Sequence, residues 1–572
     1  MGDCNEIKFK EYKMSLPEGY SRRLVGPNLF FIESGTVLDI PLEHDKQKLV
    51  ELWQAEAERI LPELRFDVIK LDYKIYNNGI RLALVAPFDI TMASCDVIDF
   101  IWASACQIFE EGAAKSIDEA KNMLIPIIES EENLKLREIH KLALSKGLNI
   151  FYDEGLVTIG SGKKSFQFNV DDLDINQIPW ATISDIPIVL VTGTNGKTTT
   201  VRMTSFICQE SKKVVGYCST DWVMIDGKIV DRGDFSGPTG NKFVLTNPDV
   251  DVAVLEVARG GLLKRGLANT HVTAAAVTNI SPDHLGEDGV ETLADLAEAK
   301  GIVYSAVESK GHAVINLDDP NMLARISQIK GEKVFVSQKL SEDELQPYID
   351  GADYVCFVKN SAFYFKSKNI EHKIAELKDV PITVNGFAKH NVENTLVAIC
   401  LSYELGCDLD QISNALKIYQ NSDKENLGRA NVFKVQGATV ILDFAHNAAG
   451  IKAIFEMAQG YEGKEITILF GQTGDRKFSI HDMCEIIEQY KPKQVLVKDT
   501  EIYLRGAEKG EVPALIESSL LLHGYPKANI KHFAIENDAV DYALDNLKSS
   551  ETYILCCHEK VEEVIEKIKS KA

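Results

Sequence analysis

The stretch PIVLVTGTNGKTTTVRM, residues 187–203, decides the fold. It reads as an apolar strand, a glycine-containing loop and the start of a helix, which is the order of a phosphate-binding loop. The common pattern, G-x-x-x-x-G-K-[ST], needs a glycine at position 191, where this chain has Val191. The glycine stands at Gly193 instead, so the loop is two residues tighter. On this stretch alone, a chance Gly-Lys-Thr after a strand remains an alternative.

The residue types in this loop suit a nucleoside triphosphate, because backbone N–H groups and the helix N-terminus would face its phosphates. Lys197 would reach the β- and γ-phosphates, and the Thr198 hydroxyl would bind Mg²⁺. The loop residues that we expect at the ATP are Gly193, Thr194, Asn195, Gly196, Lys197, Thr198 and Thr199.

Further apolar runs follow, and each ends in polar residues. Such runs, separated by helical segments, are typical of a buried parallel sheet, whose ligands lie beyond the carboxyl ends of the strands. Glu256 ends the run VAVLE and could hold Mg²⁺ opposite Thr198. His284 follows the strand that ends at Asn279 and could approach the same edge. The alternatives are a solvated strand-end carboxylate and a structural histidine.

Lys300 lies on the apolar side of a predicted helix in ETLADLAEAKGIVYSAV, residues 291–307. The apolar positions 293, 296, 297, 303, 304 and 307 form one helical stripe that includes it. An unpaired buried lysine is costly, so Lys300 needs a partner or a modification. The alternative is a side chain that extends to the surface.

Composition narrows the class of protein. A chain of 572 residues exceeds one domain, and three or four are expected at roughly 150 residues each. The net charge of −23 argues against a nucleic-acid or anionic-membrane binder. No apolar run approaches the roughly 18 residues of a membrane span. The charged residues 1–13 lack a signal peptide's apolar segment, and the 11 cysteines form no C-x-x-C pair, so we expect a cytoplasmic protein.

The chain divides into three expected α/β parts. Residues 1–175 mix short strands and helices: hairpins are predicted over 28–43, around Ser34-Gly35, and over 155–170, and a helix over 43–64. We therefore expect an N-terminal α+β domain at 1–175, a central P-loop domain with a parallel sheet at 176–424, and a C-terminal Rossmann-like α/β domain at 425–572.

Several segments resemble the Mur ligase superfamily, which includes folylpolyglutamate synthetases. The tight loop VTGTNGKTT is that family's version of the P-loop, and TNISPDHLG is similar to its magnesium-binding histidine segment. GFAKHNVENTLVA resembles its adenine-contacting segment, and GRANVF and DFAHNAAG resemble its C-terminal motifs. The segments SGPTGNKFVLTNPDVDVAVLEVARGGLLKRGL, NLDDP and LRGAEKGEV are closer still to the Mur-like half of cyanophycin synthetases. The N-terminal RLVGPNLFFIESGTVLDIPLE also resembles the start of those enzymes.

The resemblance implies an ATP-dependent ligase that joins a carboxylate to an amine through an acyl phosphate. ATP and Mg²⁺ would be required, and Lys197, His284 and a carbamylated Lys300 would be catalytic. The implied metal ligands are Thr198, Glu256, His284 and Lys300. Beyond the loop, the implied ATP-binding residues are His390, Asn391, Asn394, Arg429, Asp443 and His446. The partners would be an amino acid or amine and a carboxylate acceptor, which could be peptide-like, and a homo-oligomer is compatible with the sequence.

This chain departs from the family in two ways. Cyanophycin synthetases carry an ATP-grasp domain between their N-terminal and Mur-like parts, whereas here only a short linker joins the two. Asn431 stands in GRAN, where many Mur ligases have an acidic residue. Two other functions remain open: a P-loop switch or motor, although the base-specifying N-K-x-D motif is absent from the sequence, and a catalytically inactive protein that kept the fold.

Overall fold

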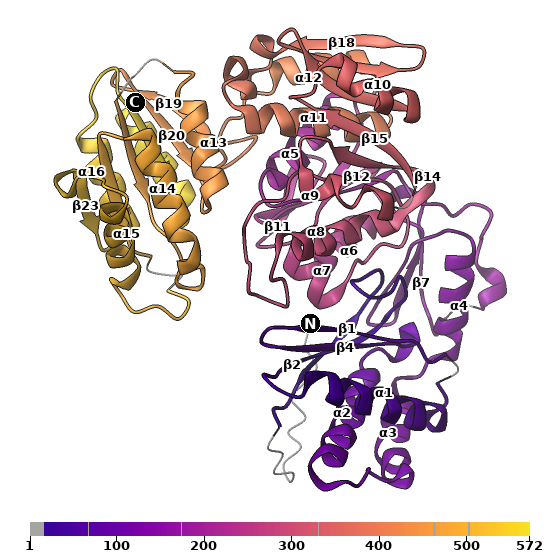
Figure 1. Cartoon of the computed structure of the whole chain (residues 1–572). Helices are drawn as coiled ribbons and strands as arrows, with labels where there is room; N and C mark the ends of the chain where they lie inside the picture. The colour runs from indigo at the N-terminus through magenta and orange to yellow at the C-terminus, as the bar shows by residue number, and fades with distance from the viewer. Residues whose placement is uncertain (1–15, 67, 173, 330, 462–464, 501–503) are drawn as a thin grey trace.

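The computed structural model describes residues 16–66, 68–172, 174–329, 331–461, 465–500 and 504–572. Residues 1–13, on which the expectation of no signal peptide rests, lie outside these ranges. None of the helices in the described part of the chain has the length and apolar character of a membrane span. Figure 1 shows the N-terminal region at the bottom, the middle region above it and the C-terminal region to one side.

The N-terminal region packs a four-stranded antiparallel sheet, ordered β1-β2-β4-β3, against helices. Its elements are β1 (Tyr20–Leu24), β2 (Gly35–Pro41), α1 (Lys46–Ile60), β3 (Leu71–Tyr76), β4 (Gly79–Val85), α2 (Ala93–Glu111) and α3 (Ile117–Glu131). Side chains alternate across the sheet: Leu38 and Leu82 pack with the helices, whereas Val37 and Ala83 lie on the other face. The predicted helix corresponds to α1, which ends before Pro62.

The expected strand over residues 28–33 is wrong. Residues 28–33 form bends and irregular backbone, and the preceding strand that pairs with β2 is β1, which lies earlier in the chain. The side-chain oxygen of Asn28 accepts hydrogen bonds from the backbone N–H groups of Phe30 (2.9 Å) and Phe31 (3.0 Å). A local turn of this kind competes with a strand for the same backbone groups.

A small three-stranded antiparallel sheet follows and leads into the middle region. Its strands are β5 (Ile150–Asp153), β6 (Leu156–Ile159) and β7 (Phe166–Asn169), and the helix α4 (Leu134–Ser145) precedes them. The predicted hairpin over 155–170 is confirmed, since β6 and β7 pair in antiparallel register.

The middle region is built on an 11-stranded sheet in the order β11-β10-β9-β12-β8-β13-β14-β15-β16-β17-β18. Its parallel strands are β9 (Val215–Cys218), β12 (Val252–Glu256), β8 (Ile188–Thr192), β13 (Val272–Val277), β14 (Val307–Asn316), β15 (Glu332–Ser337) and β16 (Tyr354–Lys359). Antiparallel strands flank them: β10 (Trp222–Ile225), β11 (Lys228–Arg232), β17 (Ala362–Ser367) and β18 (Glu371–Glu376). Because β8 lies between β12 and β13, the carboxyl ends of these three strands meet at one edge.

Helices cover both faces of this sheet (Figure 1). One face carries α5 (Lys197–Glu210), α11 (Lys389–Glu404) and α12 (Leu409–Ile418); the other carries α6 (Pro238–Leu245), α7 (Arg259–Arg265), α8 (Leu293–Gly301), α9 (Pro320–Leu323) and α10 (Glu342–Gly351). The predicted helix over 291–307 is too long, because α8 ends at Gly301 and a short 3₁₀ turn spans Ile302–Ala306. Glycine and the β-branched residues after it disfavour a continued α-helix.

The C-terminal region is a second three-layer α/β structure on a six-stranded sheet, ordered β19-β20-β24-β21-β22-β23. Only β19 runs antiparallel to its neighbour among these described strands. The strands are β19 (Asn431–Val435), β20 (Ala438–Asp443), β21 (Ile466–Phe470), β22 (Gln494–Lys498), β23 (Ile530–Phe533) and β24 (Thr552–Cys556). Helices α13 (Ala448–Ala458), α14 (Ile480–Tyr490) and α15 (Glu511–Leu522) cover one face; α16 (Glu536–Asp545) and α17 (Val561–Lys571) cover the other. The multidomain α/β fold class is confirmed.

Candidate active site

The tight P-loop connects β8 to α5, and both of its glycines are required by their neighbours. Gly193 has φ 148° and Gly196 has φ 84°, which are conformations that L side chains rarely adopt. A Cβ atom on Gly193 would lie 1.9 Å from the hydroxyl of Thr278, and one on Gly196 would lie 2.1 Å from the side-chain oxygen of Asn394. The two glycines of this shortened loop therefore stand where neighbouring side chains leave no room for a larger residue.

Two lysines converge on one backbone oxygen of this loop. Lys197 donates to the carbonyl oxygens of Gly193 (3.1 Å) and Thr194 (3.0 Å), and Lys300 donates to the same Gly193 oxygen at 2.8 Å. Lys300 is only 4% exposed, as the apolar stripe predicts. Burial lowers the pKa of both amines; for Lys300 it lies well below the usual value, and the charge on Lys197 lowers it further.

Glu256 forms the buried acidic end of β12 beside the loop. The hydroxyl of Thr198 donates to one carboxylate oxygen at 2.9 Å and lies 3.2 Å from the hydroxyl of Thr220. The other oxygen, Oε1, is buried and has no hydrogen-bond partner among the described residues. Burial raises the pKa of this carboxyl, and the charge on Lys197 opposes the increase. An orphaned carboxylate oxygen next to a hydroxyl fits a hard divalent cation.

His284 lies at the same edge, and its tautomer follows from its two partners. Nδ1 lies 2.8 Å from a carboxylate oxygen of Glu287, and Nε2 lies 2.6 Å from the guanidinium of Arg476. Because arginine only donates, Nε2 must accept, so the ring proton is on Nδ1 and points to Glu287. Arg259 stabilises this loop by donating to the backbone oxygens of His284 (3.2 Å) and Glu287 (3.3 Å).

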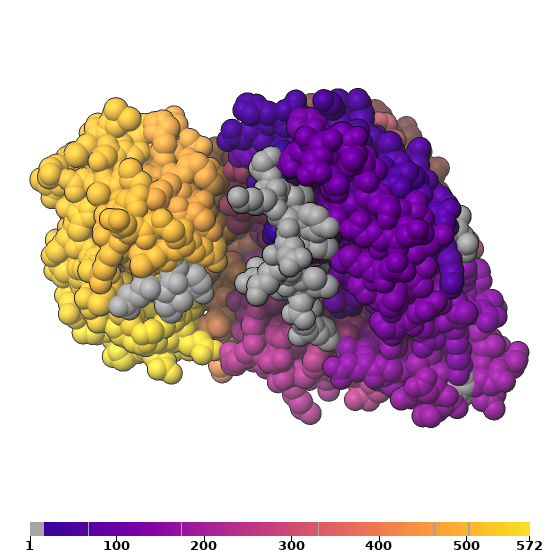
Figure 2. Space-filling model, turned by 90° about the horizontal axis from the view of Figure 1, so that it is seen from below, coloured from indigo at the N-terminus to yellow at the C-terminus, as the bar shows by residue number. Residues whose placement is uncertain are grey.

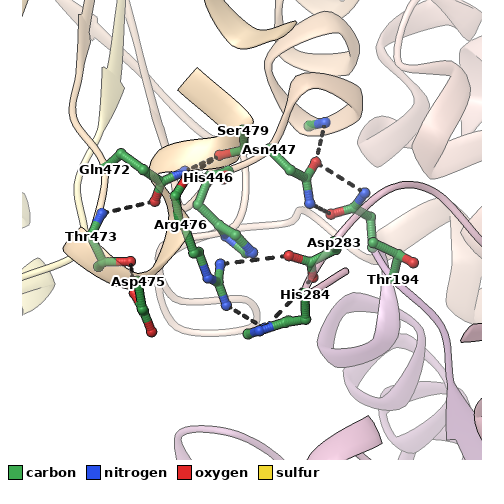
Figure 3. A network of polar contacts seen from close by, with 12 residues as sticks. Thr194, Asp283, His284, His446, Asn447, Gln472, Thr473, Asp475, Arg476 and Ser479 are labelled. Carbon is green, nitrogen blue, oxygen red and sulfur yellow. Dashed lines mark hydrogen bonds and ion pairs between the residues drawn. The ribbon is translucent and has the colours of Figure 1, made fainter. Parts of the chain in front are cut away.

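Arg476 comes from the C-terminal region, so this contact joins two parts of the molecule. Figure 3 shows its side chain pointing from the loop after β21 toward Asp283 and His284. A second bridge joins Asn195 of the P-loop to Asn447, whose side-chain amides donate to each other at 3.2 and 3.3 Å. Seen from below, the C-terminal region forms a separate lobe beside the rest of the molecule (Figure 2).

A cavity of about 260 Å³ lies between the P-loop, α11 and the C-terminal lobe. Its wall includes nine of the predicted ATP-binding residues: Asn195, Gly196, Thr199, His390, Asn391, Asn394, Arg429, Asp443 and His446. The remaining predicted residues are not in this wall: Gly193, Thr194, Lys197, Thr198, Glu256, His284 and Lys300. The structure therefore divides the predicted site into a cavity and an adjoining polar edge, with the P-loop between them.

The polar groups of the cavity are held by local contacts. Asp443 accepts from the backbone N–H of Ala430 at 2.7 Å, and burial raises its pKa to about 6. The guanidinium of Arg429 lies 4.9 Å from the ring centre of Phe444. Burial lowers the pKa of both His390 and His446 to about 4, so both rings are neutral near pH 7. The Nδ1 atom of His390 has no hydrogen-bond partner in the described part of the chain.

Sequence reasoning missed three residues of this site: Arg476, Asn447 and Glu393. Arg476 stands in GQTGDRK, directly after the apolar strand β21, so the strand-end argument that selected Glu256 would have found it. Asn447 follows His446 and begins α13 by accepting from the N–H of Gly450. Glu393 lines the cavity and accepts from Asn279 at 3.2 Å, and burial raises its pKa to about 7.

Fold and site together define a P-loop α/β protein with a cavity between the P-loop and its C-terminal lobe. Residues 191–402 match the family described as the Mur ligase middle domain, and residues 428–557 match the one described as the Mur ligase glutamate ligase domain. The chain belongs to the Mur ligase family.

The chain is 33% identical to the cyanophycin synthetase of Crocosphaera subtropica over 364 residues, which are 64% of this chain and 41% of that protein. It therefore spans less than half the length of this relative. It is 26% identical to the UDP-N-acetylmuramoyl-L-alanyl-D-glutamate–2,6-diaminopimelate ligase of Caldanaerobacter subterraneus, over 65% of this chain and 73% of that enzyme. A solved structure of E. coli FolC with DHPP and ADP aligns with a TM-score of 0.49 at 17% identity, covering 67% of this chain and 89% of that one.

Proposed function

We propose that this protein is an ATP-dependent ligase that joins a carboxylate to an amine and releases ADP and phosphate. The observation that carries the proposal is the group of residues at one sheet edge: Lys197 and Lys300 on the Gly193 oxygen, beside the buried Thr198–Glu256 pair. Such a group suits phosphoryl transfer, in which the protein positions reactants and neutralises charge. The relatives are named as ligases or synthetases, which supports the same class.

ATP would bind across the P-loop. Its base and ribose would enter the cavity beside His390, Asn394 and Arg429, and its phosphates would meet the N-terminus of α5. Lys197 would exchange its two carbonyl contacts for the β- and γ-phosphates, which bind a cation more strongly than neutral carbonyls do.

Mg²⁺ fits the polar edge, because Glu256 presents an oxygen without a partner and the Thr198 hydroxyl is 2.9 Å from the same carboxylate. Bound there, the metal would neutralise charge on the phosphates. The Nε2 lone pair of His284 could serve a second ion once Arg476 moves away. A carbamylated Lys300 would add a carboxylate at this edge, and the strongly lowered pKa favours the neutral amine that reacts with CO₂.

The reaction would have two steps. An oxygen of the acceptor carboxylate attacks the γ-phosphorus, the bond to the β,γ-bridging oxygen breaks, and ADP leaves. The amine nitrogen then attacks the acyl carbon, phosphate leaves, and the nitrogen loses a proton to form the amide. Phosphate is a far better leaving group than hydroxide, and binding both reactants side by side supplies much of the rate.

We propose the domain division 1–175, 176–424 and 425–572, which is supported by boundaries that fall between the sheets. The chain retains the motifs of one ligase site. It would therefore add a single kind of residue to a carboxylate that is already present on an amino acid or on a peptide-like acceptor. ATP use and ten buried cysteines without a disulfide in the described residues support a cytoplasmic location.

The test is ADP release by the purified protein against a grid of carboxylic acids and amino acids. A ligase releases ADP only when both partners are present, and mass spectrometry then finds the acceptor heavier by one residue. ADP release without either partner would favour a switch or motor. No release with any pair, together with no adenine-nucleotide binding, would favour an inactive homologue. Polymer made from two free amino acids alone would contradict the single-bond proposal.

A further inference from the structure

The segment from Tyr419 to Asn431 joins the middle region to the C-terminal lobe, and it carries three buried asparagines. Asn421, Asn426 and Asn431 are 7%, 0% and 1% exposed. Buried amides must have hydrogen-bond partners, because an unpaired polar group is costly away from water. Their partners therefore show what this connection holds together.

Asn431 uses both ends of its side-chain amide. Its oxygen accepts from the N–H of Gly428 at 2.7 Å, and its nitrogen donates to the backbone oxygens of Asn421 and Asn426, both at 2.9 Å. An aspartate could keep the contact to Gly428 but has no N–H to donate. The asparagine that departs from the family pattern therefore closes a loop that an acidic residue would leave open.

The other two asparagines extend this network in opposite directions. Asn426 donates to the side-chain oxygen of Asn421 (2.7 Å) and to the hydroxyl of Thr199 (3.2 Å), in the first turn of the P-loop helix α5. Asn421 donates to the backbone oxygens of Arg429 and Ala430, both at 3.1 Å. One continuous set of bonds thus joins the P-loop helix to the segment that enters the nucleotide cavity.

The backbone of that segment is strained at Ala430, so other residues must hold it in place. Ala430 has φ 54°, in the left-handed region that a non-glycine residue rarely adopts. Its oxygen is held by Asn421, and its N–H is held by Asp443 at 2.7 Å. Arg429, Ala430 and Asp443 all line the cavity. The network is therefore the part of the chain that fixes the direction in which Arg429 leaves the backbone.

We propose that Asn421, Asn426 and Asn431 are positioning residues that hold Arg429 and Asp443 against the nucleotide. This proposal rests on the proposed function, since it requires that the cavity binds an adenine nucleotide. The three asparagines make no contact with the ligand and act through Arg429 and the P-loop helix.

The experiment is calorimetric binding of ADP with Mg²⁺ to wild type and to Asn431→Asp, which keeps the shape of the side chain but replaces its two donated hydrogen bonds with a carboxyl oxygen facing two carbonyl oxygens. The account predicts ADP binding about tenfold weaker, with far-UV circular dichroism unchanged. Asn149→Asp is the matched control, because Asn149 is also fully buried and does not line the cavity. Its side chain donates to the backbone oxygen of His271 and accepts from the backbone N–H of Thr270. This control should lose stability but keep wild-type affinity for ADP.

A double-mutant cycle with Arg429→Ala separates positioning from general destabilisation. If Asn431 acts through Arg429, Asn431→Asp should weaken ADP binding little further in the Arg429→Ala background. Fully additive losses, or wild-type affinity in Asn431→Asp, would overturn the proposal. If Asn431→Asp does not fold, Asn421→Asp makes the same test, because it removes the bonds to Arg429 and Ala430 at a less buried position. Wild-type protein that binds no adenine nucleotide would instead reject the proposed function.

Discussion

The side-chain nitrogen of Lys300 lies 2.8 Å from the carbonyl oxygen of Gly193, which also accepts from Lys197 at 3.1 Å. One lysine comes from α8 and the other from α5, so two helices on opposite faces of the sheet bring their amines to the same P-loop oxygen. Two full positive charges so close together in a buried site are unfavourable. Burial lowers the pKa of both amines, and the decrease is greater for Lys300, so Lys300 gives up its proton more readily than Lys197.

Lys300→Ala should reduce turnover at least about 100-fold, because it removes the group that is expected to become a carbamate. Added acetate or formate should restore part of the activity by supplying a carboxylate in the space left. Lys300→Arg is the matched control: it keeps a cation, cannot be carbamylated and should not respond to carboxylates. Steady-state ADP release measures the activity of both variants, with and without the added carboxylate. Full activity of Lys300→Ala without any additive would remove Lys300 from the mechanism.

Lys197→Ala should abolish ADP release while the fold survives. Apart from its charge interactions, the side chain donates only to the two carbonyls of its own loop among the bonds described. We therefore expect an unfolding midpoint within about 3 °C of wild type. Thermal unfolding and ADP release, measured on the same sample, check the two halves of this prediction. A variant that is unfolded, or one that turns over normally, would contradict the role of Lys197.

Glu256→Gln should abolish the stabilisation of the protein by Mg²⁺ without destabilising the metal-free form. Burial raises the pKa of Glu256 in the folded protein, so its contribution to stability falls as pH rises from the unfolded pKa through the folded one. Once the carboxyl is ionised, glutamine removes that unfavourable buried charge. The melting temperature without Mg²⁺ should be no lower than wild type, and the increase that Mg²⁺ with ADP gives wild type should be lost. An undiminished Mg²⁺ response would show that the metal binds elsewhere.

His312 predicts a pH dependence of stability that is independent of catalysis. The carboxylates of Glu404, 3.0 Å from Nδ1, and then of Asp353, 3.0 Å from Nε2, raise its pKa to about 9, from an ordinary value near 6.5. The protonated ring stabilises the fold fully below pH 6.5, and this contribution is lost as pH rises through about 9. Urea midpoints of wild type and His312→Gln should therefore differ most below pH 6.5 and converge above pH 9. A gap that stays constant across this range would contradict the ion pairs.

Sequence patterns located the parts of the site that lie at strand ends. The P-loop was predicted from its glycine and lysine pattern, Glu256 and His284 because parallel strands end at a common edge, and Lys300 because a charged residue on an apolar stripe is unusual. The strand at 28–33 was wrong because the Asn28 side chain competes for backbone N–H groups over a few residues. Arg476 also follows a strand end, so the same argument could have selected it. Its contact with His284, and that of Asn447 with Asn195, depend on how the C-terminal lobe meets the P-loop, which no sequence pattern shows. The asparagine bonds described above lie within residues 421–431, apart from the one between Asn426 and Thr199, which spans 227 positions of the chain and which no local pattern indicates.

The transfer of oxygen from acceptor to phosphate tests the central claim most directly. With an acid and amine that support ADP release, the acid's carboxylate is labelled with ¹⁸O and the released phosphate is analysed by ³¹P NMR or mass spectrometry. Attack of the carboxylate on the γ-phosphorus, followed by amide formation, predicts one ¹⁸O atom in each phosphate released and one new amide for each ADP. Phosphate that carries no ¹⁸O, its oxygen coming from water, would contradict the acyl-phosphate ligase and leave a nucleotide hydrolase in its place.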